Sequence, residues 1–121
     1  MTVQNLPILG KTCTRIEVIE DHEIRFTCTD GTQYSMHHEQ ECCENVRIED
    51  ICGDLDDLIG VPLTVAEASS TQHESHGWQA TWESATWTFY RFAARGYVTI
   101  RWVGESNGYY SEEVSFDEVE T

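Results

Sequence analysis

Apolar side chains occupy alternate positions in three successive runs within the first third of the chain, and all of these positions are even-numbered. The runs are Ile16 and Val18; Ile24, Phe26 and Cys28; and Tyr34 and Met36. Alternation with a period of two is typical of strands that bury one face. Turn-forming residues at 20–22 and 30–31 separate the runs. The pattern therefore predicts an antiparallel meander.

The shared even numbering also predicts the length of the loop between neighbouring strands. Two strands that both bury even positions must pair residues whose numbers have an even sum, and this requires a loop with an odd number of residues. A two-residue Asp-Gly turn would place core residues opposite solvent-facing ones. We therefore expect the three-residue loop Thr29-Asp30-Gly31, with Gly31 in the left-handed conformation.

A second hairpin is predicted near the end of the chain by the same argument. Apolar residues again fall on even positions, in one run over 98–102 and in another over 114–116. A three-residue loop Ser106-Asn107-Gly108 would pair Ile100 with Val114 and Val98 with Phe116. In that register the apolar side chains of both strands would lie on the same, buried face of the hairpin.

The middle of the chain is predicted to contain three strands and a short helix. The strands are expected at 46–51, 63–68 and 82–92, and the polar stretch 69–77, which lacks periodicity, is expected to be a mobile loop. The helix is expected at 54–59, because Asp54 can cap it and Asp56 and Asp57 suit its positive end. We expect a single domain, residues 1–121, that is mainly β: antiparallel meander and hairpins in a sheet or partly open barrel, with one short helix.

The cysteines and the absence of a recognisable leader bear on the compartment. Residues 1–11 lack a charged segment followed by an apolar run, and no apolar stretch reaches the roughly 20 residues that a membrane helix needs. The five cysteines are an odd number, and two of them are adjacent. Free thiols in the cytoplasm, here that of a host cell, are the interpretation we adopt, with no membrane association.

Charge is the strongest compositional signal. The chain has 22 acidic and 7 basic residues, a formal net charge of −15. Both halves share the imbalance, since residues 1–60 carry 13 acids and 4 bases and residues 61–121 carry 9 and 3. Such a field repels nucleic acid and anionic membranes and attracts basic protein surfaces. Two interpretations of the charge remain open: it serves only to keep the protein soluble, or it forms an acidic surface that imitates the phosphate backbone of DNA.

Two acidic runs and a pair of tyrosines are the candidate partner-binding residues. The first run lies between 39 and 57 and the second between 105 and 120. We expect a partner to contact Glu39, Glu41, Glu44, Glu49, Asp50, Asp54, Asp56 and Asp57 from the first run, and Glu105, Tyr109, Tyr110, Glu112 and Glu113 near the second. Exposed tyrosine beside charged residues is typical of protein-binding surfaces.

A cluster of histidines and cysteines offers an alternative kind of site. His37, His38, Cys42 and Cys43 lie within seven residues, and zinc prefers imidazole and thiolate ligands. Adjacent cysteines on an extended chain point to opposite faces, so they would not bind one ion together. We expect no metal, and retain a metal- or small-ligand-binding site at 37–43 as the alternative.

Motifs for catalysis are missing from the sequence. It has no glycine-rich phosphate loop, no G-x-S-x-G and no H-E-x-x-H. A thiolate nucleophile is disfavoured in so negative a chain unless a local cation stabilises it. We therefore expect no catalytic residues and no cofactor.

Three blocks of the chain resemble a family of small acidic proteins encoded chiefly by bacteriophages and prophages. The blocks are SMHHEQECCENVRIEDICGDLDDLIGVPL (35–63), ATWTFYRFAARGYVTIRW (85–102) and GESNGYYSEEVSF (104–116). The family is a domain of unknown function, so the resemblance implies no site residues. It implies a context, because small acidic phage proteins often inhibit host defence, including anti-restriction and anti-CRISPR proteins that mimic DNA.

These features together predict a binding protein rather than an enzyme. We expect it to inhibit a host defence or nucleic-acid-handling complex by presenting an acidic surface to a basic, nucleic-acid-binding host protein. Direct contact with nucleic acid is not expected.

Overall fold

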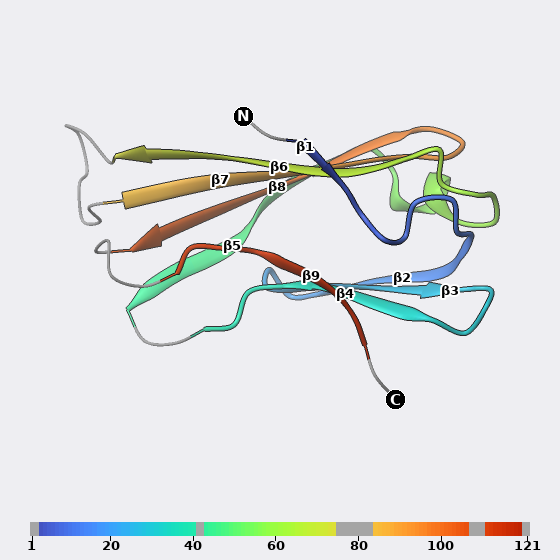
Figure 1. Ribbon diagram of the computed structural model, residues 1–121, viewed down its shortest axis with the longest axis horizontal. Coiled ribbons are helices and arrows are strands. Elements are labelled where there is room, and N and C mark those ends of the chain that lie inside the picture. Colours follow the sequence, from blue (N-terminus) through green and yellow to red (C-terminus); the bar gives the residue numbers. More distant parts are fainter. Residues whose placement is uncertain (1–2, 41–42, 75–83, 107–110, 120–121) are drawn as a thin grey trace.

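The strands of the protein form two antiparallel sheets. The computed structural model describes residues 3–40, 43–74, 84–106 and 111–119. A five-stranded sheet has the order β1-β6-β7-β8-β5, and a four-stranded sheet has the order β2-β3-β4-β9. The two sheets lie as layers one above the other (Figure 1). The prediction of a mainly β, antiparallel fold is confirmed, as two open sheets and not a closed barrel.

Each of the two sheets is made of strands from distant parts of the chain. The five-stranded sheet contains β1 (Val3–Asn5), β5 (Glu44–Cys52), β6 (Val65–Glu74), β7 (Ser84–Ala93) and β8 (Tyr97–Ser106). The four-stranded sheet contains β2 (Cys13–Ile19), β3 (Glu23–Cys28), β4 (Gln33–His37) and β9 (Ser115–Glu118). Within the described residues, no helix is long and apolar enough to cross a membrane.

The meander of β2, β3 and β4 agrees with the sequence prediction. Ile24 pairs with Met36, and the chain reverses through Thr29-Asp30-Gly31. Gly31 has φ +88°, the left-handed value that the three-residue loop requires. Asp30 closes the loop by accepting from the Thr32 amide at 3.0 Å and from Lys11 Nζ at 2.9 Å. The Thr32 hydroxyl also donates to Asp30. These hydrogen bonds, that of the Thr32 hydroxyl contributing most, hold the pKa of Asp30 well below its usual range.

The short helix is present as a single 3₁₀ turn, η1 (Leu55–Leu58). The Asp54 side chain caps it by accepting from the Asp56 amide at 3.0 Å. Leu58 is fully buried, and Leu55 and Ile59 pack partly buried against the same core. The predicted position, cap and buried face are confirmed, and the helix is shorter and tighter than an α-helix.

The predicted hairpin of residues 98–116 is wrong. β8 pairs with β7 on one side and with β5 on the other, whereas β9 pairs with β4, placing Phe116 opposite Met36. Ile100 therefore faces Tyr90 and Ile51 across the ladder, not Val114. Both edges of β8 are already occupied, so the last strand joins the other sheet. Asn107 and Gly108 lie outside the described residues.

The stretch 69–77, predicted to be a loop, is strand as far as Glu74. Residues 69–74 continue β6 and pair with β7 in an unbroken register from Ser69 with Phe89 to Glu74 with Ser84. Main-chain pairing with a neighbouring strand holds this polar segment in the sheet without an apolar alternation. Residues 75–77 lie outside the described part of the chain.

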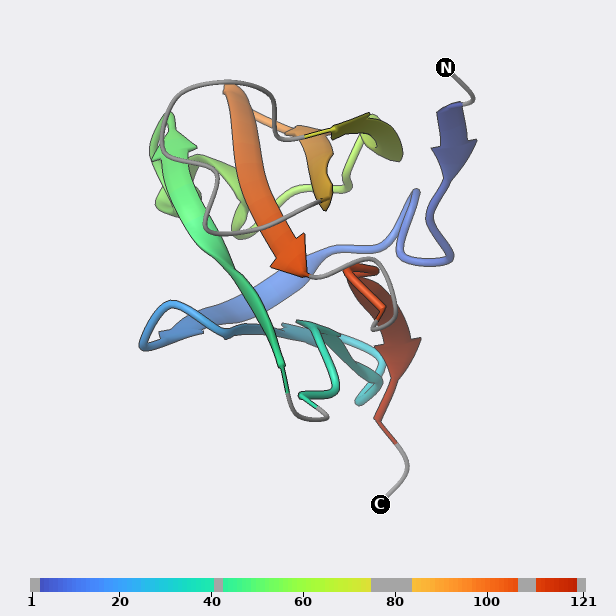
Figure 2. The same cartoon turned by 90° about the vertical axis from the view of Figure 1, so that its left-hand side faces the viewer.

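The hydrophobic core lies between the two sheets. Phe26 of β3 contacts Phe92 of β7 with a ring-centroid distance of 5.3 Å, and Phe116 of β9 lies 6.2 Å from Tyr90 of β7. β5 extends across the molecule toward the β2–β3 hairpin (Figure 2). There the Ile48 amide donates to the Asp21 carbonyl at 2.7 Å. The sheets are thus joined by aromatic packing and by a crossing strand.

Candidate functional site

A groove of about 470 Å³ lies on the outer face of the four-stranded sheet. Odd-numbered residues of β3 and β4 face away from the core, and they form its floor. The groove is lined by His22, Glu23, Arg25, Ser35, His37, His38, Glu39, Asp117, Glu118 and Val119. Three of the five histidines of the chain and four carboxylates meet here, against one arginine.

Glu23 is the centre of a hydrogen-bonded network on the floor of this groove. Its carboxylate accepts from Ser35 Oγ at 2.7 Å and from Arg25 Nε at 3.1 Å. The pKa of Glu23 is lowered, first by the Ser35 hydrogen bond and then, against the opposing effect of burial, by Arg25. The single arginine of the groove is therefore held by an acid of the same groove.

The hydrogen bond from Ser35 to Glu23 also determines what His37 can do. His37 Nδ1 lies 3.1 Å from Ser35 Oγ. Because the hydroxyl proton of Ser35 points to Glu23, Nδ1 must carry its own proton and donate to Ser35 Oγ. His37 is thus unable to accept the Ser35 proton, and this Ser–His pair is not an activated nucleophile.

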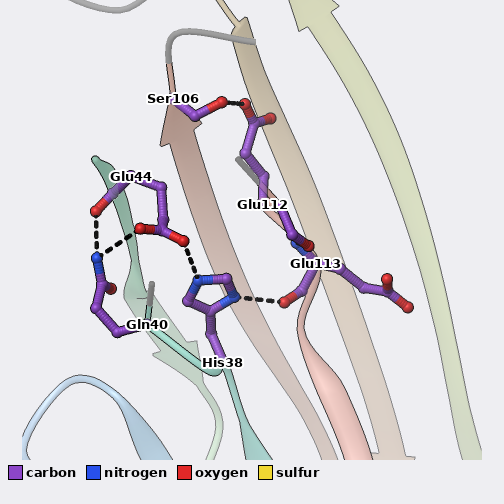
Figure 3. Close-up of polar contacts among 7 residues, drawn as sticks. His38, Gln40, Glu44, Ser106, Glu112 and Glu113 are labelled. Atoms are coloured by element: carbon purple, nitrogen blue, oxygen red, sulfur yellow. Dashed lines mark hydrogen bonds and ion pairs between the residues drawn. The ribbon is translucent and has the colours of Figure 1, made fainter. Parts of the chain in front are cut away.

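The ring of His38, at the margin of the groove, is buried between Glu44 and Glu113 (Figure 3). Its Nδ1 lies 2.7 Å from the Glu113 carbonyl and its Nε2 lies 3.3 Å from Glu44 Oε2. The side chains of His38 and Glu44 are 3% and 0% exposed. Gln40 Nε2 donates to Glu44 Oε1 at 2.9 Å and to the Glu44 carbonyl at 2.6 Å. The cluster ties the β4–β5 connection to the segment before β9.

Glu112 is the second buried acid near this cluster. Thr86 Oγ1 donates to its Oε1 at 2.6 Å, and Ser106 Oγ donates to its Oε2 (Figure 3). The residue is 7% exposed. Hydroxyl groups from β7 and β8 thus satisfy a carboxylate that sequence reasoning placed on the surface.

The structure corrects the set of surface acids in two ways. Glu44 and Glu112 are buried and present no carboxylate to a partner. Glu105 forms an ion pair with Arg47 at 3.2 Å, and Asp50 forms one with Arg101 at 2.7 Å. Glu49 also lies near Arg47, at 3.7 Å. The apparent runs of acids are therefore interrupted by burial and by arginines from distant strands.

The remaining exposed acids of the two predicted runs fall into two separate groups. Glu39, Glu113, Asp117 and Glu118 are exposed on and beside the groove, and we call them the groove acids. Asp54, Asp56 and Asp57 are exposed at η1, and we call them the helix acids. The start of β5 and the helix that follows this strand lie at opposite ends of the molecule (Figure 1). The first predicted run is thus divided: Glu39 lies with acids of the second run at the groove, and the helix acids lie away from them.

The two histidines of the possible metal site do not point toward a common centre. The His37 ring contacts Ser35 on the outer face, whereas the His38 ring is buried against Glu44. Cys43 is disulfide-bonded, which corrects the expectation of free thiols; Cys13, Cys28 and Cys52 are free. No group of three or more potential ligands for a metal ion occurs within the described residues.

Four predicted residues lie outside the described part of the chain: Glu41, Cys42, Tyr109 and Tyr110. Sequence reasoning missed Glu23, Arg25 and Ser35, although they occupy the odd positions of the strands whose even positions were assigned to the core. That alternation could have placed all three on one outer face with His37.

Comparison with known proteins supplies the family and nothing about function. No curated protein matches the chain, and no solved structure does. A family model described as a domain of unknown function (DUF7448) matches residues 6–116. The chain therefore belongs to the DUF7448 family.

Proposed function

We propose that this protein binds a basic surface of a host protein and thereby inhibits a defence or nucleic-acid-handling complex, as small acidic phage proteins do. The observation that carries the proposal is the net charge of −15 together with the exposed groove acids. A surface of this sign accelerates encounter with a basic partner and disfavours binding to nucleic acid or to an anionic membrane.

The groove acids are the part of the surface best suited to this role. Glu113, Asp117 and Glu118 form no ion pair with lysine or arginine within the part of the chain that the structure describes. Arg25, the one arginine in the groove, already forms an ion pair with Glu23 at 3.1 Å. A guanidinium or ammonium group of a partner would therefore meet carboxylates whose charge is not neutralised from within the molecule.

The test combines partner capture with matched charge reversals. Tagged protein is incubated with bacterial host lysate at low salt, and captured proteins are identified and produced for binding measurements. We expect a basic, nucleic-acid-binding partner whose association slows steeply with salt, because the screening length is about 8 Å at physiological ionic strength.

Two variants with the same change in charge locate the surface. Asp117→Lys with Glu118→Lys alters the groove acids, and Asp56→Lys with Asp57→Lys alters the helix acids. We expect the first variant to weaken binding much more than the second. Equal losses would mean that net charge acts alone, and a partner whose binding is insensitive to salt and to both variants would refute the proposal.

A second candidate function is the binding of a small ligand in the groove. The volume of about 470 Å³ lies within the range of ligand sites, and the side chains of His22 and His37 offer hydrogen-bonding groups there. A thermal-shift screen with small cationic and zwitterionic compounds tests this function. A shift that His37→Ala abolishes would support it, and the absence of any shift would exclude it for the compounds screened.

A further inference from the structure

Cys13 and Cys28 lie directly opposite each other on neighbouring strands. They are paired residues of β2 and β3, and both side chains point into the core, where they are 0% and 3% exposed. Both are free thiols. No role described so far for the groove or the acidic surface uses them.

A β-bulge produces this juxtaposition. Along most of the β2–β3 ladder, paired residue numbers sum to 42, as in Ile16 with Phe26, and this register would turn Cys13 away from the core. The register shifts between Cys13 and Arg15, leaving Thr14 as the extra residue, and Cys13 then faces Cys28. Bulges commonly redirect a side chain in this way.

The hydrogen-bonding pattern brings the two side chains as close as a strand pair permits. The Cys28 amide donates to the Thr32 carbonyl at 2.9 Å, so its main chain bonds toward β4 and not toward β2. The Cys13–Cys28 pair is therefore of the non-hydrogen-bonded kind, in which Cα atoms of a regular ladder are about 4.5 Å apart. Disulfides span Cα distances of about 4.4 to 6.8 Å.

We propose that Cys13 and Cys28 form a cross-strand disulfide when the protein meets a low-molecular-weight disulfide such as oxidised glutathione. The Cys13 thiolate attacks one sulfur of glutathione disulfide and releases one glutathione thiolate. The Cys28 thiolate then attacks the Cys13 sulfur of the mixed disulfide and releases the second. The two cysteines lose two protons and two electrons, and one glutathione disulfide becomes two glutathione molecules.

The environment of Cys13 determines when the reaction occurs. Burial, followed by the neighbouring Cys28 thiol, raises the pKa of Cys13 to about 12. Little thiolate forms at neutral pH while both residues stay buried, so the folded protein reacts slowly. Cys13 lies in β2, an edge strand of the four-stranded sheet, and local opening of this edge exposes the thiol. Oxidation then locks β2 onto β3.

Mass spectrometry of the wild-type protein tests the cross-link without a variant. Reduced protein is incubated with oxidised glutathione, with and without urea below the unfolding transition, and remaining thiols are alkylated. Cleavage with trypsin and an aspartate-specific protease separates residues 12–15 from residues 26–29. We expect these two peptides to become joined, with a mass two hydrogens below their sum, and to join faster in urea. Their alkylation as two free thiols under every condition would overturn the proposal, as would glutathione adducts that never resolve.

Variants distinguish this disulfide from other oxidation. Cys52 is exposed and is expected to form a glutathione adduct, so Cys52→Ala serves as the control that keeps the cross-link. Oxidation should raise the urea midpoint of the wild type and of Cys52→Ala more than that of Cys28→Ala, in which only the Cys43 disulfide can re-form. An equal rise in Cys28→Ala would contradict the proposed pairing.

Discussion

The indole Nε1 of Trp102 donates a hydrogen bond to Sδ of Met36 at 3.1 Å across the interior of the protein. Both side chains are 0% exposed. Trp102 belongs to β8 of the five-stranded sheet and Met36 to β4 of the four-stranded sheet. This hydrogen bond therefore links the two sheets directly, inside an otherwise apolar part of the core.

Met36→Leu should destabilise the protein by about 1–2 kcal/mol. The substitution keeps the volume of the side chain but leaves the buried indole N–H without its acceptor. Urea unfolding followed by Trp fluorescence measures the change. In a Trp102→Phe background the same substitution should cost less, because the donor is gone, and equal costs in both backgrounds would show that the bond contributes nothing.

Gly31→Ala should lower the free energy of unfolding by about 1 kcal/mol. A Cβ at this position meets no atom within 4 Å, so the cost comes from the φ of +88° and not from a clash. Gly31→Asn provides the comparison, because asparagine tolerates the left-handed conformation better. Equal destabilisation by alanine and asparagine in chemical denaturation would argue against this reason.

Ser35→Ala should raise the pKa of Glu23 toward the ordinary value of a glutamate, about 4.5, because the Ser35 hydrogen bond is the largest cause of the lowering. A carboxyl whose folded-state pKa is depressed contributes stability above its unfolded pKa, and the contribution is lost as pH falls through the folded value. The wild type should therefore lose more of its neutral-pH stability than the variant does as pH falls below about 4.5, and the difference in stability between the two proteins should shrink in acid. NMR titration of the Glu23 carboxyl carbon checks the pKa, and an unchanged titration would exclude the Ser35 effect.

His38→Ala should destabilise the protein by about 2–3 kcal/mol, because it removes a hydrogen-bond partner of the buried Glu44 carboxylate. His37→Ala is the matched control, since this neighbouring ring lies on the outer face and loses only the contacts with Ser35 and Glu39. Its cost should stay near 1 kcal/mol. Thermal or urea unfolding measures the stability of both variants. A similar loss of stability in the two would mean that the buried contacts of His38 contribute no more than the surface contacts of His37.

The period-two alternation predicted most of the core positions in the strands and the place of the first turns; Val18, which the same pattern assigned to the core, is 44% exposed at the edge strand β2. Ile24, Phe26, Met36, Ile100 and Trp102 all occupy predicted core positions and are fully buried. The loop at Gly31 followed from the same parity, and the turn at Leu55–Leu58 followed from its cap and apolar face. Such signals are local, because strand geometry makes neighbouring side chains alternate between two faces.

Only the tertiary structure decided which strands pair. Both sheets send their apolar faces into the same core, so β8 and β9 show the same alternation whether they are neighbours or belong to different layers. The bulge that turns Cys13 toward Cys28 is likewise set by pairing with β3. Whether an acid is buried also depends on hydrogen-bond partners from elsewhere in the chain. Thr86 and Ser106 contact buried Glu112, and His38 and Gln40 contact buried Glu44. A carboxylate can be buried only where such partners converge, and that convergence arises from contacts far apart in the sequence.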